Sequence, residues 1–118
     1  YRGNRHEQYN GYIMHEVVPF IRNHCNNSDI RIAVTGCSMG AYHAANFFFR
    51  HPFVFDTTIA ISGIYDLKLF IGEWTDDVVY YNSPLMYLRN LSDHHILDQL
   101  RKNTIVIAVG QGAWEEEM

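Results

Sequence analysis

A serine between two glycines, where a strand run meets a helix run, constrains this chain more than any other feature. The motif is Gly36-Cys37-Ser38-Met39-Gly40, which has the pattern G-x-S-x-G. The β-branched run 30–35 precedes it, and a run of small and aromatic residues, 41–49, follows it. This order predicts a tight strand-to-helix turn that presents the serine at the carboxyl end of a strand.

The chemistry expected of such a turn is nucleophilic. A turn this tight strains the serine backbone, and glycines on both sides avoid the collisions that side chains would cause. We therefore interpret Ser38 as a nucleophile, with the backbone N–H of Met39 as the first oxyanion donor at the positive end of the helix dipole. The alternative is an ordinary serine in a structural turn. Cys37 is the least favoured nucleophile, because its position is not the exposed tip.

The rest of the chain alternates between helix and strand patterns. Residues 1–8 are polar and are expected to be irregular, and a helical period then begins at Tyr9 and is bent at Pro19. The remaining expected elements are strands at 57–62 and 104–109 and a helix to Lys102 that is capped by Ser92-Asp93. Such alternation predicts an α/β fold, with a parallel sheet and helices on both of its faces.

Composition excludes several function classes. The net charge of −4 and the lack of a basic cluster argue against nucleic-acid binding, and no apolar stretch is long enough to cross a membrane. The seven histidines are scattered, so neither a metal nor a cofactor is expected. Two cysteines, Cys25 and Cys37, do not form a disulfide framework, which favours a reducing, cytoplasmic location.

Two features leave alternatives open. Asp66 follows the strand expected at 57–62 and is either a catalytic carboxylate or, more simply, a turn-capping one. The irregular segment 68–92 is either a packed connection or a cap that shapes a substrate pocket.

The order of the motifs resembles that of a known family. With the serine motif, Ser62-Gly63-Ile64-Tyr65-Asp66, Asn82-Ser83-Pro84 and Gly110-Gln111-Gly112, the chain resembles the putative esterase family, the α/β-hydrolase branch of esterase D, S-formylglutathione hydrolase and the antigen 85 mycolyltransferases. The resemblance implies a Ser–acid–His triad in chain order, with Ser38 at the nucleophile position. Similarity to the antigen 85 type of loop, in which a G-x-G is followed by a glutamate, favours Glu116 as the acid, with Glu115 as the alternative. Otherwise these glutamates are a solvated helix start.

The family pattern also includes parts that residues 1–118 do not supply. Its histidine follows the acid, and none of the seven histidines here does, so none is assigned as the base. Its second oxyanion donor belongs to a loop that would precede Tyr1. We therefore expect one partial α/β-hydrolase domain, an internal piece of a longer protein, inactive alone and prone to self-association through exposed sheet edges.

The function expected of the intact protein is that of a serine esterase. It would cleave a small-molecule carboxylic ester through an acyl-enzyme at Ser38, without a cofactor. The base would be a histidine beyond Met118 that Glu116 orients. The first alternative is an acyltransferase of the antigen 85 type. The second is a catalytically inactive hydrolase fold used for binding or interaction.

Overall fold

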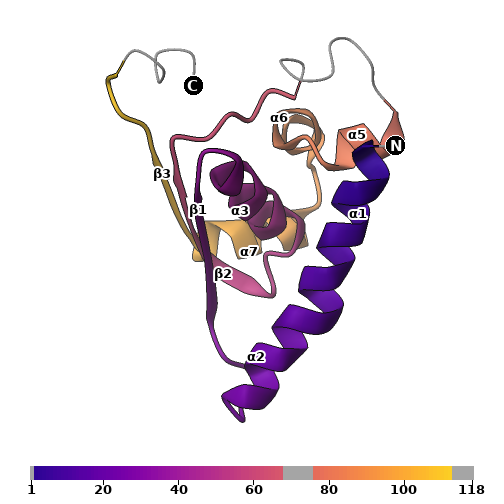
Figure 1. Ribbon diagram of the computed structural model, residues 1–118, viewed down its shortest axis with the longest axis vertical. Coiled ribbons are helices and arrows are strands. Elements are labelled where there is room, and N and C mark those ends of the chain that lie inside the picture. Colours follow the sequence, from indigo (N-terminus) through magenta and orange to yellow (C-terminus); the bar gives the residue numbers. More distant parts are fainter. Residues whose placement is uncertain (1, 68–75, 113–118) are drawn as a thin grey trace.

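The computed structural model describes residues 2–67 and 76–112, which are built around a parallel three-stranded sheet (Figure 1). Strands β1 (Ile32–Cys37), β2 (Phe55–Ile61) and β3 (Thr104–Ala108) lie side by side in this order. Their last residues are paired, Cys37 with Ile61 and Ile61 with Ala108, so all three strands end at one edge of the sheet. The predicted α/β fold class is confirmed.

The N-terminal helix is longer than predicted and is interrupted by a π-helical turn. It consists of α1 (Arg2–Tyr12), η1 (Ile13–Val17) and α2 (Val18–His24), so the prediction of irregular structure is wrong for residues 2–8. The bend expected at Pro19 takes the form of the π turn, in which the Val18 N–H donates to the Ile13 carbonyl. A proline ring collides with the carbonyl four residues earlier, and the wider π spacing accommodates it.

The remaining helices connect the strands. Helix α3 (Met39–Arg50) joins β1 to β2, and the path from β2 to β3 contains α5 (Asp77–Tyr81), α6 (Pro84–Tyr87), η2 (Leu88–Asn90) and α7 (His94–Lys102). The predicted cap of α7 is confirmed, because the Asp93 carboxylate accepts from the N–H groups of His95 and Ile96 at 2.9 and 3.3 Å. None of the helices in the described ranges combines the length and apolar character needed to cross a lipid bilayer.

In the part of the chain that the structure describes, the helices cover one face of the sheet, not both as predicted (Figure 1). The reason is the strand order. Helix α3 connects β1 to β2 and α7 connects β2 to β3, so the sheet grows in one direction through both connections. Right-handed crossovers that proceed in one direction place their helices on the same side of the sheet. Strand order, which the sequence pattern does not reveal, decides this. The shared core contains side chains from α2, α3, α7 and the sheet: Val18, Ile32, Phe47, Phe48, Phe55 and Leu100.

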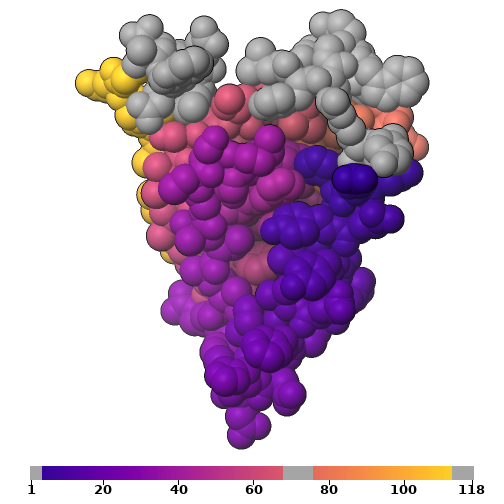
Figure 2. Space-filling view, viewed as in Figure 1, coloured from indigo at the N-terminus to yellow at the C-terminus, as the bar shows by residue number. Residues whose placement is uncertain are grey.

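The opposite face of the sheet is apolar and uncovered by the described residues. Thr35, Ile59 and Val106 are neighbours across the three strands, and Ile59 and Val106 are 37% and 43% exposed. Ile61, two residues farther along β2 on the same face, is 39% exposed. From the carboxyl edge of the sheet the molecule narrows toward the end of α2 (Figure 2). An exposed apolar sheet face with open edge strands favours association.

We expect a polypeptide of these 118 residues to self-associate through this face. Ile59→Lys places a charge in the centre of the face and should shift the polypeptide toward the monomer in sedimentation velocity. Phe20→Lys is the matched control, because Phe20 is an apolar residue of α2, 69% exposed, and belongs to no strand. An equal effect of the two substitutions would contradict association through the sheet.

Candidate active site

Ser38 is held in a backbone conformation that residues other than glycine rarely adopt. Its φ and ψ are 57° and −120°. Its N–H donates to the carbonyl of Ile61, the last residue of the neighbouring strand, at 3.0 Å. Such a conformation costs about 1–3 kcal/mol and persists only where the surroundings enforce it. The strain that the motif predicts at Ser38 is therefore present.

Ser38 stands at the N-cap of α3 but does not cap it. Serine is favoured at this position because its hydroxyl accepts from the second or third N–H of the helix, and the Ser38 side chain makes no such bond. Ser38 and Met39 are both exposed. The first N–H groups of a helix, here those of Met39 and Gly40, have no partner within the helix. An exposed hydroxyl thus lies beside N–H groups that can stabilise negative charge.

The two glycines of the motif have different roles. A Cβ on Gly36 would lie 2.3 Å from both the carbonyl carbon and the oxygen of Gly40, so the first turn of α3 could not pack against the end of β1. A Cβ on Gly40 would meet no described atom within 4 Å. The expectation that both glycines avoid collisions therefore holds for Gly36, but at Gly40 the structure shows open space.

Gly36→Ala should destabilise the protein by about 3 kcal/mol, because the new methyl group collides with backbone that cannot rotate away. Gly11→Ala, in α1, is the control. Its Cβ would meet only His15 at 3.9 Å, and it should stabilise the helix by about 0.5–1 kcal/mol. Urea unfolding of both variants measures the difference. Equal stability of Gly36→Ala and the unmodified protein would contradict the packing described.

A second strained serine ends the neighbouring strand. Ser62 has a φ of 51°, and its N–H donates to the Ala108 carbonyl at 2.8 Å. In the peptide unit between Ile61 and Ser62, the carbonyl therefore accepts from the N–H of Ser38 after β1, and the N–H donates to the carbonyl of Ala108 in β3. The sequence predicts Ser62 only as a strand residue, since nothing in a Ser-Gly pair distinguishes a left-handed serine from an extended one.

The carboxylates predicted as candidates fall in different places. Glu116 and Glu115 lie outside the described residues, and Asp66 is exposed in the turn after β2. β3 ends at Ala108 beside Ile61, so the chain leaves the sheet at the edge where Ser38 lies, and residues 109–112 continue from there. Residues 109–112, which precede both glutamates in the sequence, therefore begin at the edge of the sheet where Ser38 lies.

His43, five residues after Ser38, belongs to a cluster of rings between α1 and α3. Its ring stacks on His6 and Phe47, with centroids 5.2 and 5.9 Å apart, and meets Tyr9 and Tyr42 edge to face. Burial lowers the pKa of His43, with a smaller contribution from His6. Burial also lowers the pKa of His6, against the opposing effect of Glu7. Both rings are favoured in the neutral state and act as packing groups.

The lowered histidine pKa values predict a dependence of stability on pH. Below about pH 6.5 the unfolded chain binds protons at His6 and His43, whereas the folded protein binds them less readily because both pKa values are lowered. The stability that these residues contribute is therefore complete above this pH and is lost as the pH falls through the lowered folded values. His43→Phe keeps the stacked ring and should reduce the loss between pH 7 and pH 5. Urea unfolding at both pH values, with exposed His24→Phe as the control, tests this; an unchanged pH slope in His43→Phe would refute it.

Residues 76–92 pack against α1 and α3 through the buried side chain of Asn82. Asn82 is buried, and its side chain accepts from Asn46 and Arg50 of α3 and donates to Glu7 of α1, at 3.2, 3.0 and 2.8 Å. Its carbonyl accepts from the Tyr42 hydroxyl. This network fixes α5 and α6 against α1 and α3. Residues 68–75, the rest of the segment expected to be either a packed connection or a cap, lie outside the described residues.

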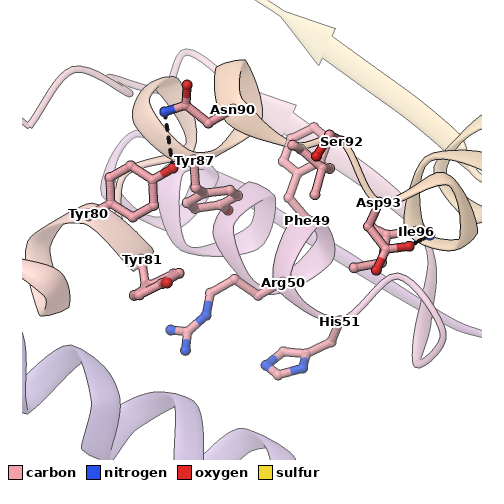
Figure 3. A pocket seen from close by; sticks show the side chains of 11 residues that line it. Phe49, Arg50, His51, Tyr80, Tyr81, Tyr87, Asn90, Ser92, Asp93 and Ile96 are labelled. Carbon is pink, nitrogen blue, oxygen red and sulfur yellow. Dashed lines mark hydrogen bonds between the residues drawn. The ribbon is translucent and has the colours of Figure 1, made fainter.

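A cavity of about 470 Å³ lies at the C-terminal end of α3 (Figure 3). Its main polar groups have protein partners: Arg50 pairs with Glu7, His51 with Asn10, and Asn90 with the Tyr80 hydroxyl. Arg50 is the last residue of the 12-residue helix, roughly 17 Å along the axis from its first. The cavity is therefore separate from the candidate site at Ser38. In the described ranges, no three His, Cys, Asp or Glu side chains converge as metal ligands would.

The α/β architecture, with a strained serine at the carboxyl edge of a parallel sheet, is that of a hydrolase-type fold. The model of the family described as "Putative esterase" matches residues 2–117. The chain belongs to this esterase family, as the order of its motifs indicated. No curated protein and no solved structure matches the chain.

Proposed function

We propose that this chain carries the nucleophile of a serine esterase that works through an acyl-enzyme. The observation that supports this most directly is the state of Ser38: strained, exposed, and at a helix N-cap without capping it. If this position had only a structural role, a glycine there would remove the strain, or the serine hydroxyl would cap the helix.

The proposed reaction has two steps, formation of the acyl-enzyme and its hydrolysis. The Ser38 Oγ attacks the acyl carbon of a carboxylic ester while its proton passes to a base, and the Met39 N–H donates to the resulting oxyanion. The bond to the alcohol oxygen then breaks, and the alcohol leaves with that proton. Water attacks the acyl-enzyme in the same way, releasing the carboxylic acid and restoring the Ser38 hydroxyl.

The remaining members of the triad are part of the proposal. Glu116 is the proposed acid and Glu115 the alternative, in the order Ser–acid–His that the family implies. The base is then a histidine that follows the acid in the chain. His43 does not suit this role, because its ring is packed between His6 and Phe47.

Ser38 is a better nucleophile candidate than its strained neighbour Ser62. Ser38 is followed directly by the 12-residue helix α3, whose first N–H groups can donate to an oxyanion that forms at this serine. Ser62 is followed by a turn, residues 63–67, that contains no helix. Of the two strained serines in the described ranges, Ser38 is therefore the one that combines an exposed position with oxyanion donors.

Transfer of the acyl group to an alcohol would use the same acyl-enzyme and differ only in the acceptor. Analysis of the products formed from an ester in the presence of an alcohol distinguishes transfer from hydrolysis. A hydrolase fold used only for binding would form no acyl-enzyme at all.

In the full-length gene product, Ser38→Ala should abolish covalent labelling by a fluorophosphonate probe, because the probe reacts with an activated serine hydroxyl. Ser28→Ala, in an exposed turn, should leave labelling intact. Ser62→Ala identifies the rival: labelling that survives Ser38→Ala and disappears in Ser62→Ala would move the nucleophile to the neighbouring strand. Intact mass spectrometry of the labelled proteins measures each case.

A further inference from the structure

The ring of Tyr65 lies against Gly63, two residues after the end of β2, and near the first turn of α3. A Cβ on Gly63 would lie 2.6 Å from the Tyr65 hydroxyl oxygen, 2.7 Å from its Cζ and 2.9 Å from the Cβ of Ala41. Tyr65 also packs against the buried cluster of Ala41, Ala45 and Ala60, through which α3 approaches β2 closely. A side chain at position 63 would therefore collide with Tyr65 and Ala41, and glycine, which has no Cβ, avoids this collision.

This contact reaches Ser38 through the helix backbone. The N–H of Ala41 donates to the carbonyl of Ser38 at 3.1 Å, so displacement of Ala41 would displace the serine. On its other side, the Ser38 N–H donates to Ile61 at 3.0 Å. The segment from Ile61 to Tyr65 therefore holds both the N–H and the carbonyl end of the nucleophile residue.

The Tyr65 hydroxyl does not explain the contact. Among the described residues this buried oxygen has no hydrogen-bond partner, and burial raises the pKa of the group. A buried hydroxyl without a partner is unfavourable for folding. The ring itself, by its shape and position, is what the helix end packs on.

We propose that Tyr65 is a positioning residue for Ser38: its ring holds the first turn of α3, and with it the Met39 N–H, at the geometry required for attack. This inference rests on the proposed function. It assigns Tyr65 no contact with substrate and no part in proton transfer. Displacing a reacting group by about 1 Å can cost on the order of 100-fold in rate, so a ring that fixes the turn affects reactivity as well as stability.

The test compares Tyr65→Phe with Tyr65→Leu in the full-length gene product. The measurements are the rate constant of fluorophosphonate labelling at Ser38, per folded molecule, and kcat and KM for p-nitrophenyl acetate. Tyr65→Phe keeps the ring and should label within about twofold of the unmodified protein, with an equal or higher unfolding midpoint. Tyr65→Leu should label about 10- to 100-fold more slowly, through kcat and not KM.

Gly63→Ala gives a second measurement in case Tyr65→Leu does not fold. The new methyl group pushes the ring and Ala41 apart and should also slow labelling, whereas Gly11→Ala in α1 should not. Combining Gly63→Ala with Tyr65→Leu should cost less than the two separate effects, since the leucine vacates the space that the methyl group needs.

The outcomes separate this inference from the proposed function. Equal labelling rates per folded molecule in Tyr65→Leu, Gly63→Ala and the unmodified protein would overturn the role of Tyr65 and leave Ser38 as the nucleophile. A slow Tyr65→Phe would also overturn it, because the hydroxyl and not the ring would then matter. If the unmodified protein is not labelled at Ser38, both the proposed function and this inference fail.

Discussion

One peptide unit, between Ile61 and Ser62, ties together the three strand ends on which the candidate site is built. Its carbonyl accepts from Ser38 after β1, and its N–H donates to Ala108 at the end of β3. The strand ends are thereby fixed relative to one another where β1 turns into α3 and β3 leaves the sheet. A serine nucleophile depends on partners from different strands, so this cross-link sets the distances within which any triad here has to form.

The packing of α3 changes along its length in a way that suits this geometry. Near Ser38 the helix meets β2 through Ala41, Ala45 and Ala60, which are almost fully buried and bring the two backbones close together. Farther along, Phe47 and Phe48 fill the wider space between the helix and the rest of the core. Small residues at the serine end leave few rotamers to adjust, so the turn is held by backbone contacts and by the ring of Tyr65.

The sequence predicts the fold class and the strained turn because both depend on local patterns. A β-branched run, a glycine that allows close approach, and a helical run are all readable in residues 30–49. Helix coverage of a single face was not predictable in the same way, because it follows from strand order. The helix at 2–8 was missed because it is held by distant partners, such as the Arg50 that pairs with Glu7. The role of Ser62 depends on a backbone angle that composition does not reveal.

The packing that stabilises the core also keeps Ser38 in its strained backbone conformation. Two left-handed serines cost about 1–3 kcal/mol each, a substantial part of the 5–15 kcal/mol by which domains are usually stable. That cost is offset by the hydrogen bonds between the strand ends and by packing on the covered face, where Phe48 and Ala41 are fully buried. Loosening this packing would allow Ser38 to relax toward an ordinary φ, and the relaxed serine could use its hydroxyl to cap α3. A relaxed turn is therefore more stable locally but unsuited to attack, and the core of this domain is what prevents the relaxation.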